Sequence, residues 1–123
     1  MTLLFSVAFG GLMGACGVIL AASASHGPAQ SASLQSAAYM LLFHAVAVVA
    51  GASLMDRDVL WRGPLVLGIL AWIIGASLFS GQIAAQAFLG RGLFPMAAPT
   101  GGTIMIAGWI AITIAACGAF GKR

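Results

Sequence analysis

The sequence carries very little charge. Only seven of its 123 residues are Asp, Glu, Lys or Arg, whereas a water-soluble domain usually devotes roughly a quarter of its residues to charge. Residues 1–55, 63–90 and 92–121 contain none of these four residue types. This scarcity excludes an ordinary soluble domain and predicts an integral membrane protein.

Motifs for catalysis are also lacking. No carboxylate lies in the long uncharged segments, which argues against a pump that relays protons through Asp or Glu side chains. No stretch resembles a nucleophile triad, a glycine loop that cradles phosphate, or the zinc-binding helix of a metalloprotease. We therefore expect a protein that is not an enzyme.

Apolar residues fill the uncharged segments. They make up 62% of the chain, and the mean hydropathy is +1.10. A helix needs about 20 apolar residues to cross the hydrocarbon core of a bilayer. The sequence predicts an all-α membrane protein that is a single domain over residues 1–123, an antiparallel four-helix transmembrane bundle with spans at about 2–24, 34–55, 64–89 and 103–120.

The few basic residues predict an orientation. With four spans, Arg57, Arg62, Lys122 and Arg123 share one side of the membrane, and the other side holds only Arg91. Cytoplasmic loops carry the excess of Lys and Arg, so both termini are expected in the cytoplasm. The net charge of +3 is thus a matter of topology, and no nucleic acid partner is expected.

One alternative, cleavage at the end of the first span, bears on this layout. Ala22-Ser23-Ala24 resembles a signal-peptide cleavage site, but the apolar run is too long for a typical signal core and no basic residue precedes it. The connection at 25–33 contains Gly27-Pro28, which predicts a short extracytoplasmic turn. The first span is therefore expected to remain as a helix.

The two cysteines are not expected to form a disulfide. At about 1.5 Å rise per residue, Cys16 lies ~20 Å and Cys117 ~5 Å from the cytoplasmic side. A disulfide needs Cα atoms within roughly 7 Å of each other. We expect two buried free thiols.

Small residues recur at helical spacing in three of the four spans. Because lipid is as apolar as leucine, membrane helices associate through close backbone packing at such residues. A tightly packed bundle with little room for a wide pore is predicted. The stripes are Gly10, Gly14, Gly17 and Ala21; Gly68, Ala71 and Gly75; and Gly108, Ala111, Ala115 and Gly118.

His44 falls near the bilayer midplane, where an ionisable side chain is costly and is by default a hypothesis for a functional site. The alternative is a neutral histidine hydrogen-bonded across a helix interface. His26 lies at the outer end of the first span, ~15 Å from His44 along the membrane normal. The two histidines are therefore not expected to share a metal ion.

Two further sets of polar or sulfur-bearing residues allow more than one interpretation. Met13 and Cys16 lie at depths comparable to His44, a combination that suits copper, yet methionine at helical spacing more often serves packing. No metal or cofactor is predicted. Gln82 and Gln86 share one helix face, where they either bond between helices or line a small polar cavity.

Several short strings, taken in order along the chain, resemble one known family. They are Gly14-Ala15-Cys16-Gly17-Val18, Ala24-Ser25-His26, Phe43-His44-Ala45, Leu78-Phe79-Ser80-Gly81, Pro99-Thr100-Gly101-Gly102 and Gly108-Trp109. Their order and spacing are similar to the bacterial YgdD-like family, domain of unknown function 423. The resemblance implies a small four-helix inner-membrane protein and supplies no activity.

On the predicted topology, the family-like residues gather in the outer half of the bilayer. The hypothesis is one extracytoplasmic ligand pocket, and the alternative is that glycines and Pro99 shape a tight turn that Thr100 caps. The candidate pocket residues are His26, His44, Ser80, Gly81, Gln82, Gln86, Pro99, Gly101 and Gly102.

The sequence is compatible with three functions. The first is a scaffold or accessory subunit that acts through helix–helix contacts with a membrane-protein partner or with further copies of itself, in the lipid bilayer. The second is a transporter, channel or lipid-binding protein for a small neutral ligand that uses the outer pocket. The third is a haem or copper protein that uses His44.

Overall fold

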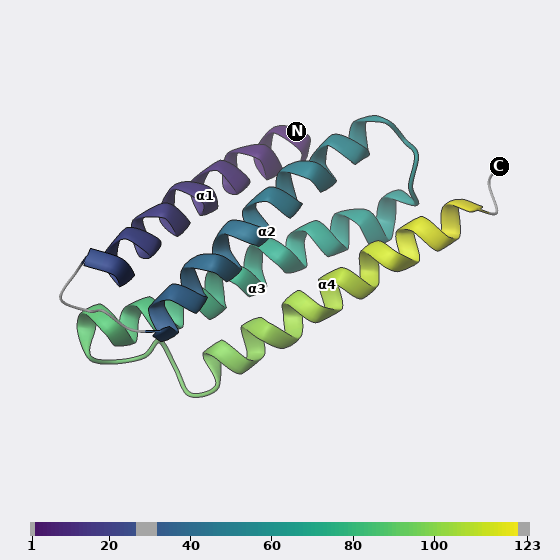
Figure 1. The fold of residues 1–123 in the computed structure, drawn as a ribbon. Coiled ribbons are helices and arrows are strands. Elements are labelled where there is room, and N and C mark those ends of the chain that lie inside the picture. Colours follow the sequence, from purple (N-terminus) through teal and green to yellow (C-terminus); the bar gives the residue numbers. More distant parts are fainter. Residues whose placement is uncertain (1, 27–31, 121–123) are drawn as a thin grey trace.

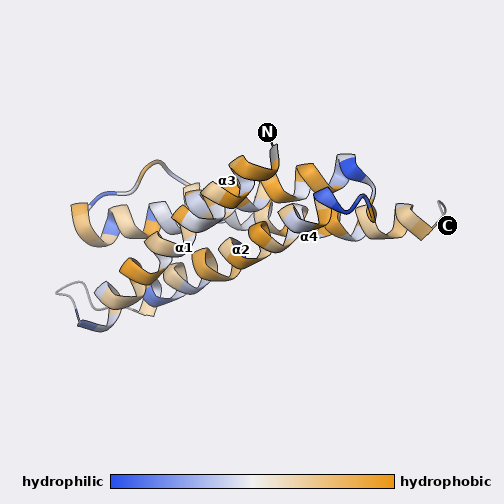
Figure 2. Ribbon diagram, turned by 90° about the horizontal axis from the view of Figure 1, so that it is seen from above, coloured by the Kyte–Doolittle hydropathy of each residue, from blue (hydrophilic) through white to orange (hydrophobic). Residues whose placement is uncertain are grey.

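The computed structural model describes residues 2–26 and 32–120, and these form four helices. They are α1 (Thr2–His26), α2 (Ala32–Asp56), α3 (Arg62–Leu89) and α4 (Ala97–Phe120). Each is long and apolar enough to cross a membrane. In Figure 2, hydrophobic residues run along all four helices. Lipid offers no hydrogen bonds to the backbone, so such segments form helices, in which the backbone bonds to itself. The predicted all-α class with four membrane-spanning helices is confirmed.

The helices follow one another across the molecule in chain order (Figure 1). In α2 and α3, 44% and 39% of the most apolar stretch is buried, against 22% in both α1 and α4. No Cα atom of α1 lies within 8 Å of one in α4. The helices described here therefore form an open array, with α2 and α3 at its centre and α1 and α4 at its edges.

Glycines set the closest approach between α3 and α4. A Cβ atom on Gly75 would lie 2.8 Å from the carbonyl oxygen of Gly101, and one on Gly101 would lie 2.6 Å from that of Gly75. Gly68 and Gly108 form a second such pair. A Cβ atom on Gly68 would lie 3.0 Å from the carbonyl oxygen of Gly108, and one on Gly108 would lie 3.1 Å from that of Gly68. Residue numbers rise on α3 as they fall on α4, so these two helices pack in opposite directions over most of their length.

The packing of α1 on α2 uses the same device. A Cβ atom on Gly10 would meet Val49 at 2.7 Å, and one on Gly17 would meet Leu42 at 2.7 Å. Gly14 leaves ordinary van der Waals space, since its nearest neighbour would be Ala45 at 3.9 Å. The stripe predicted on the first span therefore places α1 against α2, with Gly10 and Gly17 as the close contacts.

The helix ends differ in part from those expected. The fourth helix begins at Ala97, six residues before the start expected from the sequence, because Pro99 lies in the first helical turn, where a missing N–H costs nothing. Met96, with φ 67°, makes the turn that precedes it. Gly90, with φ 66°, ends α3 in the left-handed conformation that glycine adopts freely. Gly27-Pro28, Lys122 and Arg123 lie outside the described residues.

Candidate functional site

His44 is buried, with only 6% of its surface exposed, at the middle of α2. Its Nδ1 lies 2.8 Å from the Met40 carbonyl oxygen, and the Trp109 Nε1–H donates to its Nε2 at 3.3 Å. An indole nitrogen can only donate, so Nε2 accepts and Nδ1 carries the proton given to Met40. Both ring nitrogens of a neutral imidazole are thereby bonded.

Two tryptophans surround this histidine. The Trp72 and Trp109 rings lie 6.3 and 6.1 Å from the His44 ring, both edge-on, and 4.4 Å from each other. Trp72 is buried, and its Nε1 has no hydrogen-bond acceptor among the described residues. The three rings join α2, α3 and α4 in a packed aromatic cluster, which we call the His–Trp cluster. The sequence marked His44 but did not point to Trp72.

The geometry does not bring copper ligands together around His44. Its ring nitrogens are already engaged, while Met13 and Cys16 line a different part of the molecule, between α1 and α3. Among the described residues, no group of three or more His, Cys, Asp or Glu side chains could hold a metal ion. Cys16 and Cys117 are unpaired, as predicted, but both are exposed rather than buried.

Ser80 and Gln82 hold parts of the backbone in place. The Ser80 hydroxyl is buried and donates to the Ala37 carbonyl oxygen at 2.8 Å, which ties α3 to α2. The Gln82 Oε1 accepts from the Leu93 N–H at 2.6 Å, which ties the loop before α4 to α3. Both side chains therefore have structural partners within the chain.

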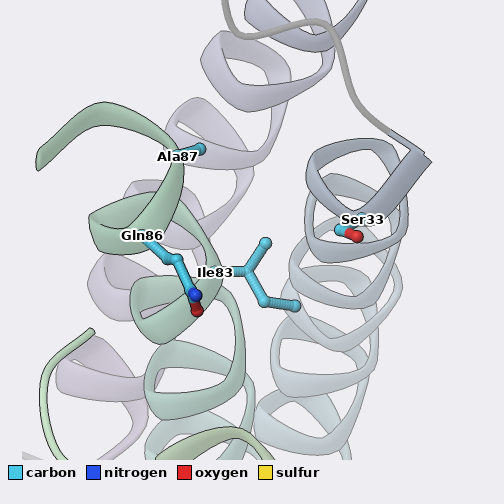
Figure 3. Close-up of a pocket in the computed structure, with 4 residues that line it drawn as sticks. All are labelled: Ser33, Ile83, Gln86 and Ala87. Carbon is cyan, nitrogen blue, oxygen red and sulfur yellow. The ribbon is translucent and has the colours of Figure 1, made fainter. Parts of the chain in front are cut away.

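Gln86 lines a cleft of about 400 Å³ with Ser33, Ile83 and Ala87, between the start of α2 and the end of α3. In Figure 3, Ile83 projects from α3 toward the helix that carries Ser33, and the Gln86 amide is directed along α3. A separate groove of about 370 Å³, between α1 and α3, includes Ser80 and Gly81 in its lining. The cleft and the groove have no lining residue in common.

The remaining predicted pocket residues lie in other surroundings. His26 is exposed at the end of α1. Pro99, Gly101 and Gly102 are helical residues of α4 rather than a turn, and Gly101 is buried against Gly75 and Phe79. The Thr100 N–H donates to the Met96 carbonyl oxygen within this first turn. Neither the cleft nor the groove is lined by His26, Pro99, Gly101 or Gly102.

A family model described as "Protein of unknown function (DUF423)" matches residues 13–102. The chain belongs to this family. The match confirms the resemblance seen in the sequence, and it extends over all nine predicted pocket residues and Trp72. It ends before Trp109, the hydrogen-bond partner of His44.

A curated relative of the family carries a membrane designation. The UPF0382 membrane protein of Haemophilus influenzae is 37% identical over 71 residues, which are 58% of this chain and 55% of that protein. The chain thus spans about half the length of the relative it matches. No solved structure matches. Together with the four apolar helices, the family match makes this chain a membrane protein of an uncharacterised family.

Proposed function

We propose that this protein is a scaffold or accessory subunit of the inner membrane, with both termini in the cytoplasm, and that it acts through helix–helix contacts rather than as an enzyme. One observation carries the proposal. The two edge helices, α1 and α4, each leave most of their apolar length unburied within the chain. A helix with such a face can pack against a neighbouring membrane protein through small residues and close contact.

The bonding of polar side chains supports the same function. Ser25, Ser36, Ser53, Thr103 and Thr113 donate to the carbonyl oxygen four residues earlier in their own helices. His44 and Ser80 are bonded between helices. A path for a polar solute needs side chains that offer free hydrogen-bonding groups to the solute, and these side chains already have partners.

Affinity purification of the tagged chain in mild detergent tests the proposal. Mass spectrometry of the eluate should find one or a few membrane proteins at a reproducible ratio to the bait. They should be absent from a parallel purification out of cells that make the untagged chain. If the same purification from membranes crosslinked before detergent is added recovers only the tagged chain, the scaffold function is wrong.

Liposome experiments separate this function from transport. Purified protein in liposomes should give no solute flux above that of empty vesicles, and His44→Ala should change nothing but stability, since His44 is bonded to Met40 and Trp109. Flux that disappears with His44→Ala would favour a transporter instead.

A further inference from the structure

The connection between α3 and α4 exposes apolar side chains at one end of the helix array. Every residue from Phe88 to Met96 is exposed. We call this stretch, the last two residues of α3 and the loop that follows, the α3–α4 segment. Such an apolar surface is unfavourable in water. Its large apolar side chains are Phe88, Leu89, Leu93, Phe94 and Met96, of which Met96 and Leu89 are 69% and 67% exposed.

Hydrogen bonds hold the segment in this shape. The Leu93 N–H donates to the Gln82 Oε1 at 2.6 Å. The Ala97 N–H donates to the Phe94 carbonyl oxygen at 3.3 Å. Gln82 lies seven residues before the last residue of α3, so the chain leaves α3 and folds back beside it. The apolar side chains are therefore presented to the surroundings by a backbone with fixed partners.

The middle of the array gives a reference for depth in the membrane. His44 and Trp109 lie at the middle of α2 and of α4 and are hydrogen-bonded to each other. Trp72 of α3 contacts both of their rings. The hydrocarbon core of a bilayer is about 30 Å thick, and the whole bilayer about 40–45 Å. A bilayer centred at the level of these rings therefore has its headgroup layer between about 15 and 20 Å from them.

On this scale the α3–α4 segment passes through the headgroup layer. Leu89 lies seventeen residue steps, or about 25 Å, from Trp72 along α3. Gln82, which accepts from Leu93, lies ten steps, or about 15 Å, from Trp72. The chain thus turns at the outside of the headgroups and returns to the edge of the hydrocarbon at Leu93. Phospholipid surrounds a protein at this depth.

Arg91 is the only charged residue of the segment, and the chain offers it no carboxylate on its side of the array. The two acidic residues, Asp56 and Asp58, lie where α2 ends and in the connection to α3, at the opposite end (Figure 1). There they accompany Arg57 and Arg62. A guanidinium carries paired N–H donors that match the geometry of a phosphate. A phosphate in the headgroup layer therefore supplies the charge that Arg91 lacks.

From this depth and charge we infer that the α3–α4 segment is a binding site for a membrane phospholipid. Arg91 binds the phosphate of the headgroup, and Leu93 and Met96 lie against the upper part of the acyl chains. A phospholipid carries both a phosphate and hydrocarbon, whereas free phosphate supplies only the charge. The headgroup layer is polar, so the loop also remains within reach of water-soluble reagents. This role goes beyond the scaffold function and does not depend on it.

Native mass spectrometry tests the site. The full-length protein is reconstituted with phosphatidylethanolamine and phosphatidylglycerol, extracted in mild detergent and released into the spectrometer. It should retain a bound phospholipid. Arg91→Ala should lower this retention about tenfold, the loss expected for a hydrogen bond to a charged group.

A matched variant makes the test specific. Arg57→Ala removes an arginine that lies between Asp56 and Asp58 at the other end of the array, and it should leave the retention as it was. Retention that falls equally in both variants, or in neither, would overturn the proposal. If Arg91→Ala loses helical content by circular dichroism, Arg91→Gln replaces it, since glutamine keeps a long polar side chain without the charge.

A photocrosslink identifies what the segment touches. Phe94→benzoylphenylalanine keeps an aromatic side chain at an exposed position of the loop, and illumination of intact cells joins it to a neighbouring C–H group. A product with the added mass of one phospholipid is expected, and it should weaken when Arg91→Ala is added.

Three outcomes of the photocrosslink would overturn the lipid site. A product with a second protein would assign the segment to a protein partner. The absence of any product would leave it in water. A lipid product that is equally strong with Arg91→Ala would be ordinary boundary lipid. Partner capture by the tagged chain is measured separately, so either proposal can fail alone.

Discussion

Trp109 and His44 are joined by a hydrogen bond between helices whose backbones do not approach each other. The indole Nε1 lies 3.3 Å from Nε2 of the imidazole, yet no Cα atom of α2 lies within 8 Å of one in α4. The two side chains meet beside Trp72 of α3. The His–Trp cluster therefore connects three helices through side chains at the middle of α2.

A double-mutant cycle measures this connection. His44→Phe and Trp109→Phe each remove one partner and keep an aromatic ring. We expect a coupling free energy of about 0.6 kcal/mol, the average for hydrogen bonds between membrane helices, and at most about 1.7 kcal/mol. The free energy of unfolding in bicelles is the measurement.

Trp61→Phe serves as the control for that cycle. Trp61 lies just before α3 and packs on Gly118, so its effect and that of His44→Phe should add. A coupling indistinguishable from zero for the His44 and Trp109 pair would mean that the hydrogen bond contributes nothing in the membrane.

The sequence predicted the buried histidine but not its surroundings. Midplane depth and small neighbours on the same helix were enough to place His44 inside the protein. Its partner Trp109 is 65 residues away, and the Ser80 partner Ala37 is 43 residues away. Such pairs depend on how the helices pack, which no local pattern in the chain specifies.

Gly101 and Gly102 are neighbours in α4 with opposite surroundings, which predicts opposite effects of the same change. A Cβ atom on Gly101 would lie 2.6 Å from the Gly75 carbonyl oxygen, whereas one on Gly102 would meet nothing within 4 Å. We expect Gly101→Ala to destabilise the protein by roughly 1–3 kcal/mol through overpacking. Gly102→Ala should be neutral or stabilise it by up to about 1 kcal/mol, since alanine is the better helix former.

Thermal unfolding of both variants in the same detergent checks this contrast. Equal losses of stability in the two variants would mean that the α3–α4 approach at Gly75 and Gly101 is looser than described. An increase in stability for Gly101→Ala would contradict the close contact outright.

The same residues show where local patterns mislead. For Pro99, Gly101 and Gly102 the sequence offers a ligand pocket or, as the alternative, a tight turn, because proline and glycine commonly interrupt helices. In the structure Pro99 occupies the first turn of α4, and Gly101 is needed for helix contact. The long uncharged segments, by contrast, identified all four helices, since lipid leaves the backbone few alternatives.

Gln82 holds the loop between α3 and α4, and its removal should free that loop. Its Oε1 accepts from the Leu93 N–H, and a Cβ on Gly92 would overlap its amide group. Loss of this bond is worth about 0.5–1.5 kcal/mol. Gln82→Ala should therefore speed hydrogen exchange at the Leu93 amide by up to about tenfold.

Two variants complete that experiment. Gln82→Glu keeps an acceptor oxygen at the same distance along the side chain and should preserve much of the protection. Gln86→Ala removes an exposed amide four residues away, which has no hydrogen bond among the described residues, and should leave exchange at Leu93 unchanged. Equal exchange in all three variants would show that Gln82 does not hold the loop.

The proposed orientation can be tested without altering any charged residue. Val59, between α2 and α3, and Phe94, between α3 and α4, are both exposed loop residues. In a background with Cys16→Ser and Cys117→Ser, Phe94→Cys should react with an impermeant maleimide applied to intact cells. Val59→Cys should react only after the membrane is permeabilised, because Arg57 and Arg62 favour the cytoplasmic side.

Both single-cysteine variants need a labelling control in detergent, where each thiol should react fully. Val59→Cys labelled from outside, with Phe94→Cys protected, would keep the four-span layout and reverse its orientation. Labelling of both from the same side would contradict the layout itself, because a helix of 28 residues lies between the two loops and spans about 42 Å, more than the ~30 Å hydrocarbon core.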